Sequence, residues 1–175
     1  EVEGLQRVRI SSIEPNLLTD EIIALAAERP NIMPHFHIPL QSGCDRILER
    51  MHRHYPRQLY ADKVQLIKQY MPQAFVAADV IVGFPGETEA DFMETVDFLQ
   101  NIPISCLHVF PYSQRPNTPA AVMPDPYTRE DKQRHFDALT ELSGRISGEK
   151  HREYVGKVLE VLVDGETGRE EYNLS

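Results

Sequence analysis

One carboxylate lies in a segment that otherwise has the composition of a buried strand. Asp79 interrupts the apolar run over residues 75–84 (FVAADVIVGF), which is typical of a parallel strand covered on both faces. An unpaired carboxylate in such a strand would cost several kcal/mol of folding free energy. We therefore expect Asp79 to have a charged partner, a ligand or a water-filled cavity beside it.

Other polar residues follow the same alternation. Because side chains alternate across a strand, three further predicted strands each have one apolar and one polar face. The second face carries Arg7, Arg9 and Ser11 in the first strand, His35, His37 and Gln41 in the next, and His108, Phe110 and Tyr112 in the last. This pattern predicts a sheet with helices on its apolar side and a polar concave side that can hold a ligand.

The segments that follow the predicted strands are small, polar or rich in glycine. They are residues 11–15 (SSIEP), 41–43 (QSG), 83–87 (GFPGE) and 112–115 (YSQR). In open parallel sheets, ligands bind beyond the carboxyl ends of the strands. Gly83 and Gly86 would let a ligand approach bare backbone, although a plain turn and helix cap would explain the same motif.

Strand and helix patterns alternate along the chain and position these residues. Strands are predicted over residues 7–12, 35–40, 75–84 and 106–113, with helices from the Thr19 cap to Pro30 and over 45–53, 58–70, 87–101 and 129–154. A loop covers 114–127, and a strand over 157–163 opens a further unit. Such alternation predicts an α/β fold with a parallel sheet. Four strands cannot close an eight-stranded barrel, so we expect an open sheet or part of a half-barrel.

Composition limits the classes of function. The chain has 175 residues, which suits one domain, and its net charge of −9 argues against a broad basic face for nucleic acid. No apolar run approaches the ~20 residues of a membrane helix, and the first residues are no signal peptide. Cys44 and Cys106 form neither a metal motif nor a disulfide framework, which favours reduced thiols in the cytosol.

Four motifs, in order along the chain, resemble one family. RISSIEP, HIPLQSGCDRILERMHRHY, DVIVGFPGETEADF and FPYSQRPNTPA are similar to the radical S-adenosylmethionine (SAM) methylthiotransferases. SSIEP resembles the bacterial branch that modifies threonylcarbamoyladenosine in tRNA. The resemblance implies a (β/α) half-barrel in which residues 1–155 supply strands three to six. It also implies that residues 156–175 begin a small β RNA-binding module.

The same resemblance implies the chemistry. Such an enzyme uses SAM and 4Fe-4S clusters to add a methylthio group to a modified adenosine next to the anticodon of tRNA, in the cytoplasm. The cluster-binding CxxxCxxC loop of the family is absent, and the chain begins at Glu1. We therefore expect a fragment that is inactive alone, with no cluster ligands of its own. An open sheet edge at residues 7–12 would favour self-association.

The family pattern also assigns roles to single residues. Superfamily SAM contacts correspond to Glu14, Gln41, Arg53 and Asp79. Arg53 suits the methionine carboxylate and Asp79 suits the ribose. Gln41 suits the amino group or the ribose. Glu14 suits the amino group or ribose as Gln41 does. Further cofactor-binding candidates are Ser42, Gly83, Phe84, Phe110 and Tyr112, of which the last four would border the adenine. Candidates for the substrate side are His35, His37 and Arg115. The motif implies no metal ligand in this chain.

Other functions stay open at this point. The chain could belong to another radical SAM iron–sulfur enzyme. It could also be a metal-dependent hydrolase, because His35, His37, His108 and Asp79 resemble a set of ligands for a divalent metal. A non-catalytic binding module is a third possibility. Bound zinc with three histidine ligands would favour the hydrolase.

Overall fold

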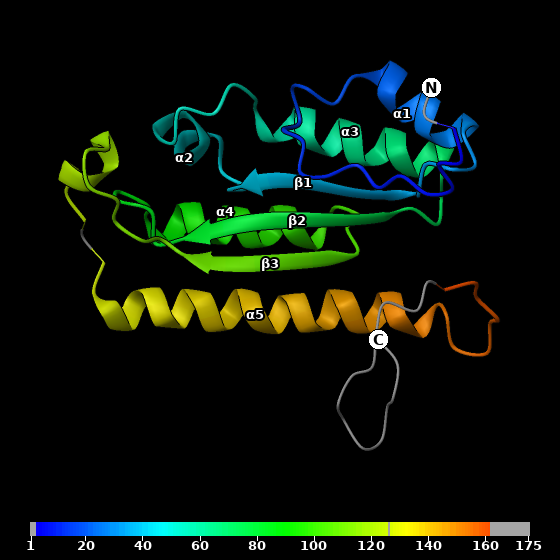
Figure 1. Cartoon of the computed structure of the whole chain (residues 1–175). Helices are drawn as coiled ribbons and strands as arrows, with labels where there is room; N and C mark the ends of the chain where they lie inside the picture. Colours follow the sequence, from blue (N-terminus) through cyan, green and yellow to red (C-terminus); the bar gives the residue numbers. More distant parts are fainter. Residues whose placement is uncertain (1–2, 126, 162–175) are drawn as a thin grey trace.

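The computed structural model describes residues 3–125 and 127–161. Three parallel strands form one sheet in the order β1 (His35–Gln41), β2 (Phe75–Val82) and β3 (Cys106–Pro111). Around them lie α1 (Asp20–Glu28), α2 (Asp45–Arg50), α3 (Arg57–Tyr70), α4 (Glu89–Gln100) and α5 (Arg129–Arg152). Figure 1 shows the three strands side by side, with α3 along β1 and α5 along β3. The predicted parallel α/β architecture is confirmed.

Threonine caps set where three of the helices begin. Thr19 accepts a hydrogen bond from the backbone N–H of Ile22 at the start of α1. Thr88 and Thr128 form capping boxes with Asp91 and Asp131 at the starts of α4 and α5. In each box, side chains satisfy backbone N–H groups that the first helical turn leaves without partners. The positions of the helices therefore follow from local sequence.

The hydrophobic core lies between one face of the sheet and the helices. Burial alternates along β1, and β2 buries Val76, Ala78, Val80 and Val82. Against this face pack apolar side chains of α3, α4 and α5, including Tyr60, Val64, Ile67, Phe92, Leu99, Leu139 and Leu142. The two-faced sheet that the alternation predicts is thus present. On the opposite face, Ala77 is buried but Asp79 and Ile81 are only half-buried, so β2 is covered on both faces only in part, contrary to the prediction.

The segment over residues 7–12 does not form the predicted strand. It makes a single parallel bridge, between Val8 and Ile32, and Ile13 donates one backbone hydrogen bond to His37. The backbone of Val8 exchanges hydrogen bonds with Asn31 and Met33 in the turn before β1, so no continuous ladder with β1 develops. An alternating apolar pattern is not sufficient where the neighbouring backbone pairs with a turn.

Three smaller predictions also need correction. The helix expected over residues 45–53 ends at Arg50 as α2. The loop over 114–127 contains a short 3-10 helix, η1 (Pro119–Val122). The described part of the strand expected over 157–163, residues 157–161, is not a strand, and the rest lies outside the described residues. Among described helices, none has the length and apolar character needed to cross a membrane.

Candidate active site

A pocket of about 610 Å³ lies where the strands end. Its polar and aromatic lining comes from all three strands and the segments after them. Among the predicted site residues it brings together Gln41, Arg53, Asp79, Phe84, Phe110, Tyr112 and Arg115. Parallel strands present their carboxyl ends at one edge of a sheet, so residues distant in sequence converge there.

Two residues of the pocket hold strained backbone. Gln41 has φ of 71° and His52 has φ of 55°, both in the left-handed region that residues other than glycine seldom adopt. Gln41 stands at an irregularity in the β1–β2 pairing, between Pro39 and Gln41. Such strain costs about 1–3 kcal/mol per residue and is concentrated at functional sites. The two outliers add a second indication that this pocket is functional.

An ion pair joins Arg53, which lines the pocket, to Glu14, which does not line it. Arg53 Nη1 donates to Glu14 Oε1 at 2.6 Å, and both side chains are partly exposed. The Nε atoms of Arg53 and of Arg50 are buried without a hydrogen-bond partner among the described residues, as is the hydroxyl of Tyr112. Buried polar groups in folded proteins are nearly always hydrogen-bonded. Each of these three groups can donate a hydrogen bond to a polar ligand.

Asp79 lies at the centre of a hydrogen-bonded group on the open face of the sheet. Its Oδ1 is 2.7 Å from His37 Nε2 and 2.9 Å from His108 Nδ1. Ser12 Oγ lies 2.7 Å from the other ring nitrogen of His37, Nδ1. The carboxylate thus has the charged or polar partners that its position in β2 requires. Because both imidazoles contact Oδ1, Oδ2 can accept from a ligand hydroxyl.

Aromatic side chains form one wall of the pocket. Phe84 is buried, and its ring meets Tyr112 edge to face at a centroid distance of 5.3 Å. Phe110 is 49% exposed, which is unusual for a large apolar side chain on a strand. A flat, weakly polar ring such as a purine can stack or pack on these faces.

The loop between β2 and α4 is held by a buried carboxyl group and by a partly exposed ion pair. Gly83, with φ of 70°, donates its N–H to the Glu87 carboxylate at 2.8 Å. Burial raises the pKa of Glu87 to about 7. Arg46 of α2 pairs with Asp91 of α4 and also donates to the carbonyl of Gly86 at 2.8 Å. These contacts fix the loop that carries Phe84.

Some predicted site residues lie outside the pocket. Ser42 is buried, with its hydroxyl between Thr95 and the Cys44 N–H. Gly83 packs against the side chain of Lys132, so its backbone is not free for a ligand in the way the GFPGE motif suggested. His35 stacks on Phe75, away from the pocket, and burial lowers its pKa, with Arg9 adding to the effect.

The pocket also contains residues that the sequence did not identify as site residues. Arg50 donates to the carbonyl of Pro85 at 3.2 Å, and the pocket's outer wall comes from Thr118, Pro119, Ala120 and Met123 around η1. The run Arg50-His52-Arg53-His54 could have indicated Arg50, but a basic run is usually a solvated surface. Nothing in the sequence of the proline-rich loop indicated that it would line the pocket.

Neither cysteine fits an iron–sulfur cluster. A cluster is held by cysteine thiolates. Cys44 is buried beside Asp91, and burial raises the pKa of its thiol to about 12, which disfavours the thiolate. Cys106 is the first residue of β3, so it lies at the end of that strand away from the pocket.

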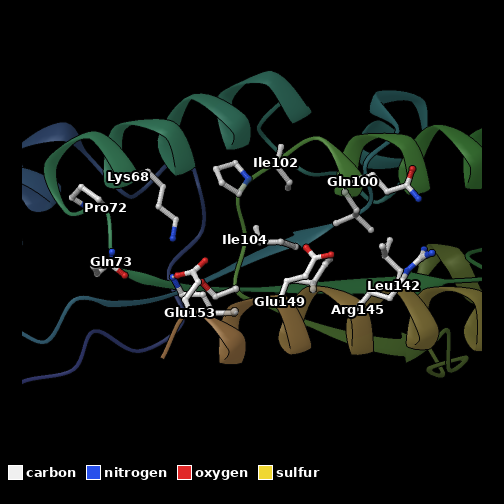
Figure 2. Close-up of a pocket in the computed structure, with 15 residues that line it drawn as sticks. Lys68, Pro72, Gln73, Gln100, Ile102, Ile104, Leu142, Arg145, Glu149 and Glu153 are labelled. Carbon is white, nitrogen blue, oxygen red and sulfur yellow. The ribbon is translucent and has the colours of Figure 1, made fainter. Parts of the chain in front are cut away.

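A second and larger pocket lies at the opposite ends of the strands. It measures about 740 Å³, and Figure 2 shows Lys68 of α3, Arg145 and Glu149 of α5, and Glu153 just after α5 around it. Lys68 donates to the carbonyl of Ala74 at 2.6 Å, so this amino group is already satisfied. None of the predicted site residues lines it.

Comparisons with known proteins place the chain in a family. A tRNA-2-methylthio-N(6)-dimethylallyladenosine synthase of Thermobifida fusca is 45% identical over 171 residues, covering 98% of this chain and 35% of the relative. The threonylcarbamoyladenosine tRNA methylthiotransferase MtaB of Bacillus subtilis is 45% identical over 161 residues, covering 92% of this chain and 36% of the relative. The chain thus spans about a third of the length of these curated relatives.

A solved structure gives the same result for the fold. Coproporphyrinogen III oxidase (HemN) from Escherichia coli, a radical SAM enzyme, matches with a TM-score of 0.65 at 15% identity, over 80% of this chain and 32% of that one. The profile of the Radical SAM superfamily matches residues 2–99, more than half of the sequence. The chain therefore belongs to the radical SAM superfamily.

Proposed function

We propose that this chain forms a SAM-binding part of a tRNA methylthiotransferase that adds a methylthio group to a modified adenosine next to the anticodon. The observation that carries the proposal is the single pocket that collects Gln41, Arg53, Asp79 and an aromatic wall. Relatives of two methylthiotransferase types each share 45% of their aligned residues with this chain. The SSIEP motif favours the threonylcarbamoyladenosine type.

The ion pair of the pocket suits the amino-acid end of SAM. A free amino acid presents a carboxylate and an ammonium group side by side. Arg53 and Glu14, 2.6 Å apart, present the complementary pair of charges. The unpartnered Nε of Arg53 can donate to the carboxylate while Glu14 accepts from the ammonium. Gln41 can add an amide contact to the amino group or ribose.

The rest of the pocket suits the nucleoside end. Asp79 Oδ2 can accept from a ribose hydroxyl, and Phe84, Phe110 and Tyr112 can border the adenine. When bound, SAM supplies radical chemistry that depends on an iron–sulfur cluster. Since neither cysteine of this chain fits a cluster, the role of these residues is to bind and orient SAM and to exclude water.

The pocket also offers a local site for RNA. The chain is acidic, but Arg50, His52, Arg53 and Arg115 gather around this one cavity. Arginine binds phosphate in a bidentate manner and stacks on bases. A tRNA nucleotide that enters this cavity would meet these side chains. A tRNA substrate would also place the protein in the cytoplasm.

A SAM titration of the cluster-loaded holoenzyme tests this proposal. Replacing Arg53 by Ala or Asp79 by Asn should weaken SAM binding by about 1–3 kcal/mol, the range for a lost hydrogen bond to a charged group. His54→Ala is the matched control, because His54 is exposed beside Arg53 and does not line the pocket. Equal SAM affinity in Arg53→Ala and His54→Ala would refute the assignment. Mass spectrometry of tRNA nucleosides then identifies the modified base.

Self-association is a separate proposal. Among the described residues, the backbone of the preceding segment pairs with the outer edge of β1 only at the Ile13–His37 hydrogen bond, since residues 7–12 form no strand beside it. Unpaired backbone groups on a strand edge can pair with a second copy. Light scattering over a range of concentrations would show a dimer, whereas a constant monomer mass would exclude this edge pairing.

A further inference from the structure

The polar group at the centre of the sheet contains three side chains that could hold a metal ion. His37 Nε2, Asp79 Oδ1 and His108 Nδ1 all lie within 4.8 Å of one another. They come from three adjacent strands, and Asp79 is the direct register partner of His108 in the β2–β3 pairing. Since the backbone of each strand is held by a hydrogen-bonded ladder, the three ligand atoms are positioned by the most rigid part of the fold.

We propose that His37, Asp79 and His108 form a binding site for a divalent cation of the Zn²⁺ class. Two imidazole nitrogens and one carboxylate oxygen are ligands that suit Zn²⁺, Co²⁺ and Ni²⁺ better than Mg²⁺ or Ca²⁺, which prefer oxygen. Three protein ligands also leave a coordination position open. This inference does not depend on SAM binding.

The distances fit such a cation after a small adjustment. Metal bonds of about 2.0–2.2 Å to each ligand require ligand atoms roughly 3–3.5 Å apart. The observed distances from Asp79 Oδ1 are 2.7 Å to His37 and 2.9 Å to His108, which are hydrogen-bond distances. The rings of the two histidines are nearly perpendicular, at 84°, so they do not stack on each other. A ring nitrogen of each histidine contacts the same carboxylate oxygen of Asp79, and a cation would replace these two hydrogen bonds.

An outer contact orients one of the ligands. Ser12 Oγ lies 2.7 Å from His37 Nδ1. In a metal-bound state, Nδ1–H would donate to this hydroxyl and leave the Nε2 lone pair for the cation. Such outer hydrogen bonds fix the tautomer and ring orientation of metal-binding histidines. His35, two residues earlier on the same face of β1, stacks on Phe75 and takes no part in the cluster.

The cluster is accessible from two sides. Asp79 lines the candidate active-site pocket. His37 and His108 line a smaller neighbouring cavity of about 290 Å³, together with Cys106. Only 17% of the Asp79 side chain is exposed, whereas the value is 46% for His108. An ion can therefore enter through the His108 side while its carboxylate ligand stays shielded from water.

A Zn²⁺ titration of the 175-residue chain by calorimetry tests the site. We expect one ion per chain, a loss of at least about 10-fold in affinity for His108→Ala and Asp79→Asn, and a loss of about 10–100-fold for Ser12→Ala. His35→Ala and Cys106→Ser are matched controls from the same face of the sheet and should bind like wild type. Far-UV circular dichroism confirms that each variant is folded.

Several outcomes would overturn the proposal. They are the absence of Zn²⁺ binding by the wild type, equal affinity in His108→Ala and His35→Ala, or loss of binding in Cys106→Ser alone. If a ligand variant does not fold, NMR of the wild type decides the question. Zn²⁺ should then shift the imidazole signals of His37 and His108 and leave those of His35 in place, and unchanged signals would refute the site.

Discussion

Replacing Asp91 by Asn should destabilise the contact between α2 and the loop that precedes α4. Asp91 accepts from Arg46 Nε at 2.8 Å, from the Thr88 backbone N–H at 2.7 Å and from the Cys44 thiol at 3.2 Å. It closes the capping box of α4 and ties α2 to the loop that carries Gly86. The Arg46 guanidinium holds the pKa of Asp91 well below its usual range.

The size of the effect follows from these contacts. A hydrogen bond to a charged group contributes about 1 kcal/mol more than a neutral one, and Asp91 accepts at least three. The amide NH₂ of the new side chain would in addition face one of the groups that donate to Asp91. We expect a loss of about 3 kcal/mol, at the low end for a broken buried ion pair because Arg46 is 46% exposed.

Urea unfolding followed by circular dichroism measures this loss. The midpoint should fall by roughly 1–1.5 M in Asp91→Asn. Asp97→Asn, an exposed change on the same helix, should stay within about 0.5 kcal/mol of wild type. Because the folded pKa of Asp91 is depressed, its contribution is present above the unfolded pKa of about 3.9 and is lost as the pH falls below it. Equal midpoints for the two variants at neutral pH would refute the reasoning.

Three further predictions concern other residues. Thermal unfolding should show that Gly43→Ala lowers the free energy of unfolding by about 1–3 kcal/mol, because a Cβ would come within 2.9 Å of the α4 backbone. Gly144→Ala, in open space on α5, should raise it by about 0.5–1 kcal/mol. Burial raises the pKa of Glu87 to about 7, so its contribution to stability is lost as the pH rises through that value; urea unfolding should find Glu87→Gln more stable than wild type at about pH 8 and not at about pH 5. Mass spectrometry after brief alkylation should find Cys106 modified before Cys44, whose buried thiol has a pKa raised to about 12, and the reverse order would contradict the structure.

Local sequence determined most of the elements. Thr19 marks the start of a helix in the sequence and caps α1 in the structure. Thr88, which the sequence placed inside the helix predicted over residues 87–101, instead caps α4. The alternation of β1 predicted which of its side chains are buried. These features depend on residues a few positions apart, so they can be recognised without knowledge of the fold. Asp79 could be identified as a functional candidate for the same reason, because its neighbours are apolar.

What lies beside a given side chain could not be obtained in this way. The sequence grouped Asp79 with three histidines as possible metal ligands, but the register of three strands decided that one carboxylate oxygen meets His37 and His108. The third histidine, His35, stacks on Phe75 instead. Likewise, the alternation over residues 7–12 predicted a strand, but the backbone of Val8 pairs with the turn before β1. Pairing and register depend on contacts between distant segments, which compete with one another only in the folded chain. The sequence therefore determined the elements and the candidate residues, and the tertiary structure alone decided which of them form one site.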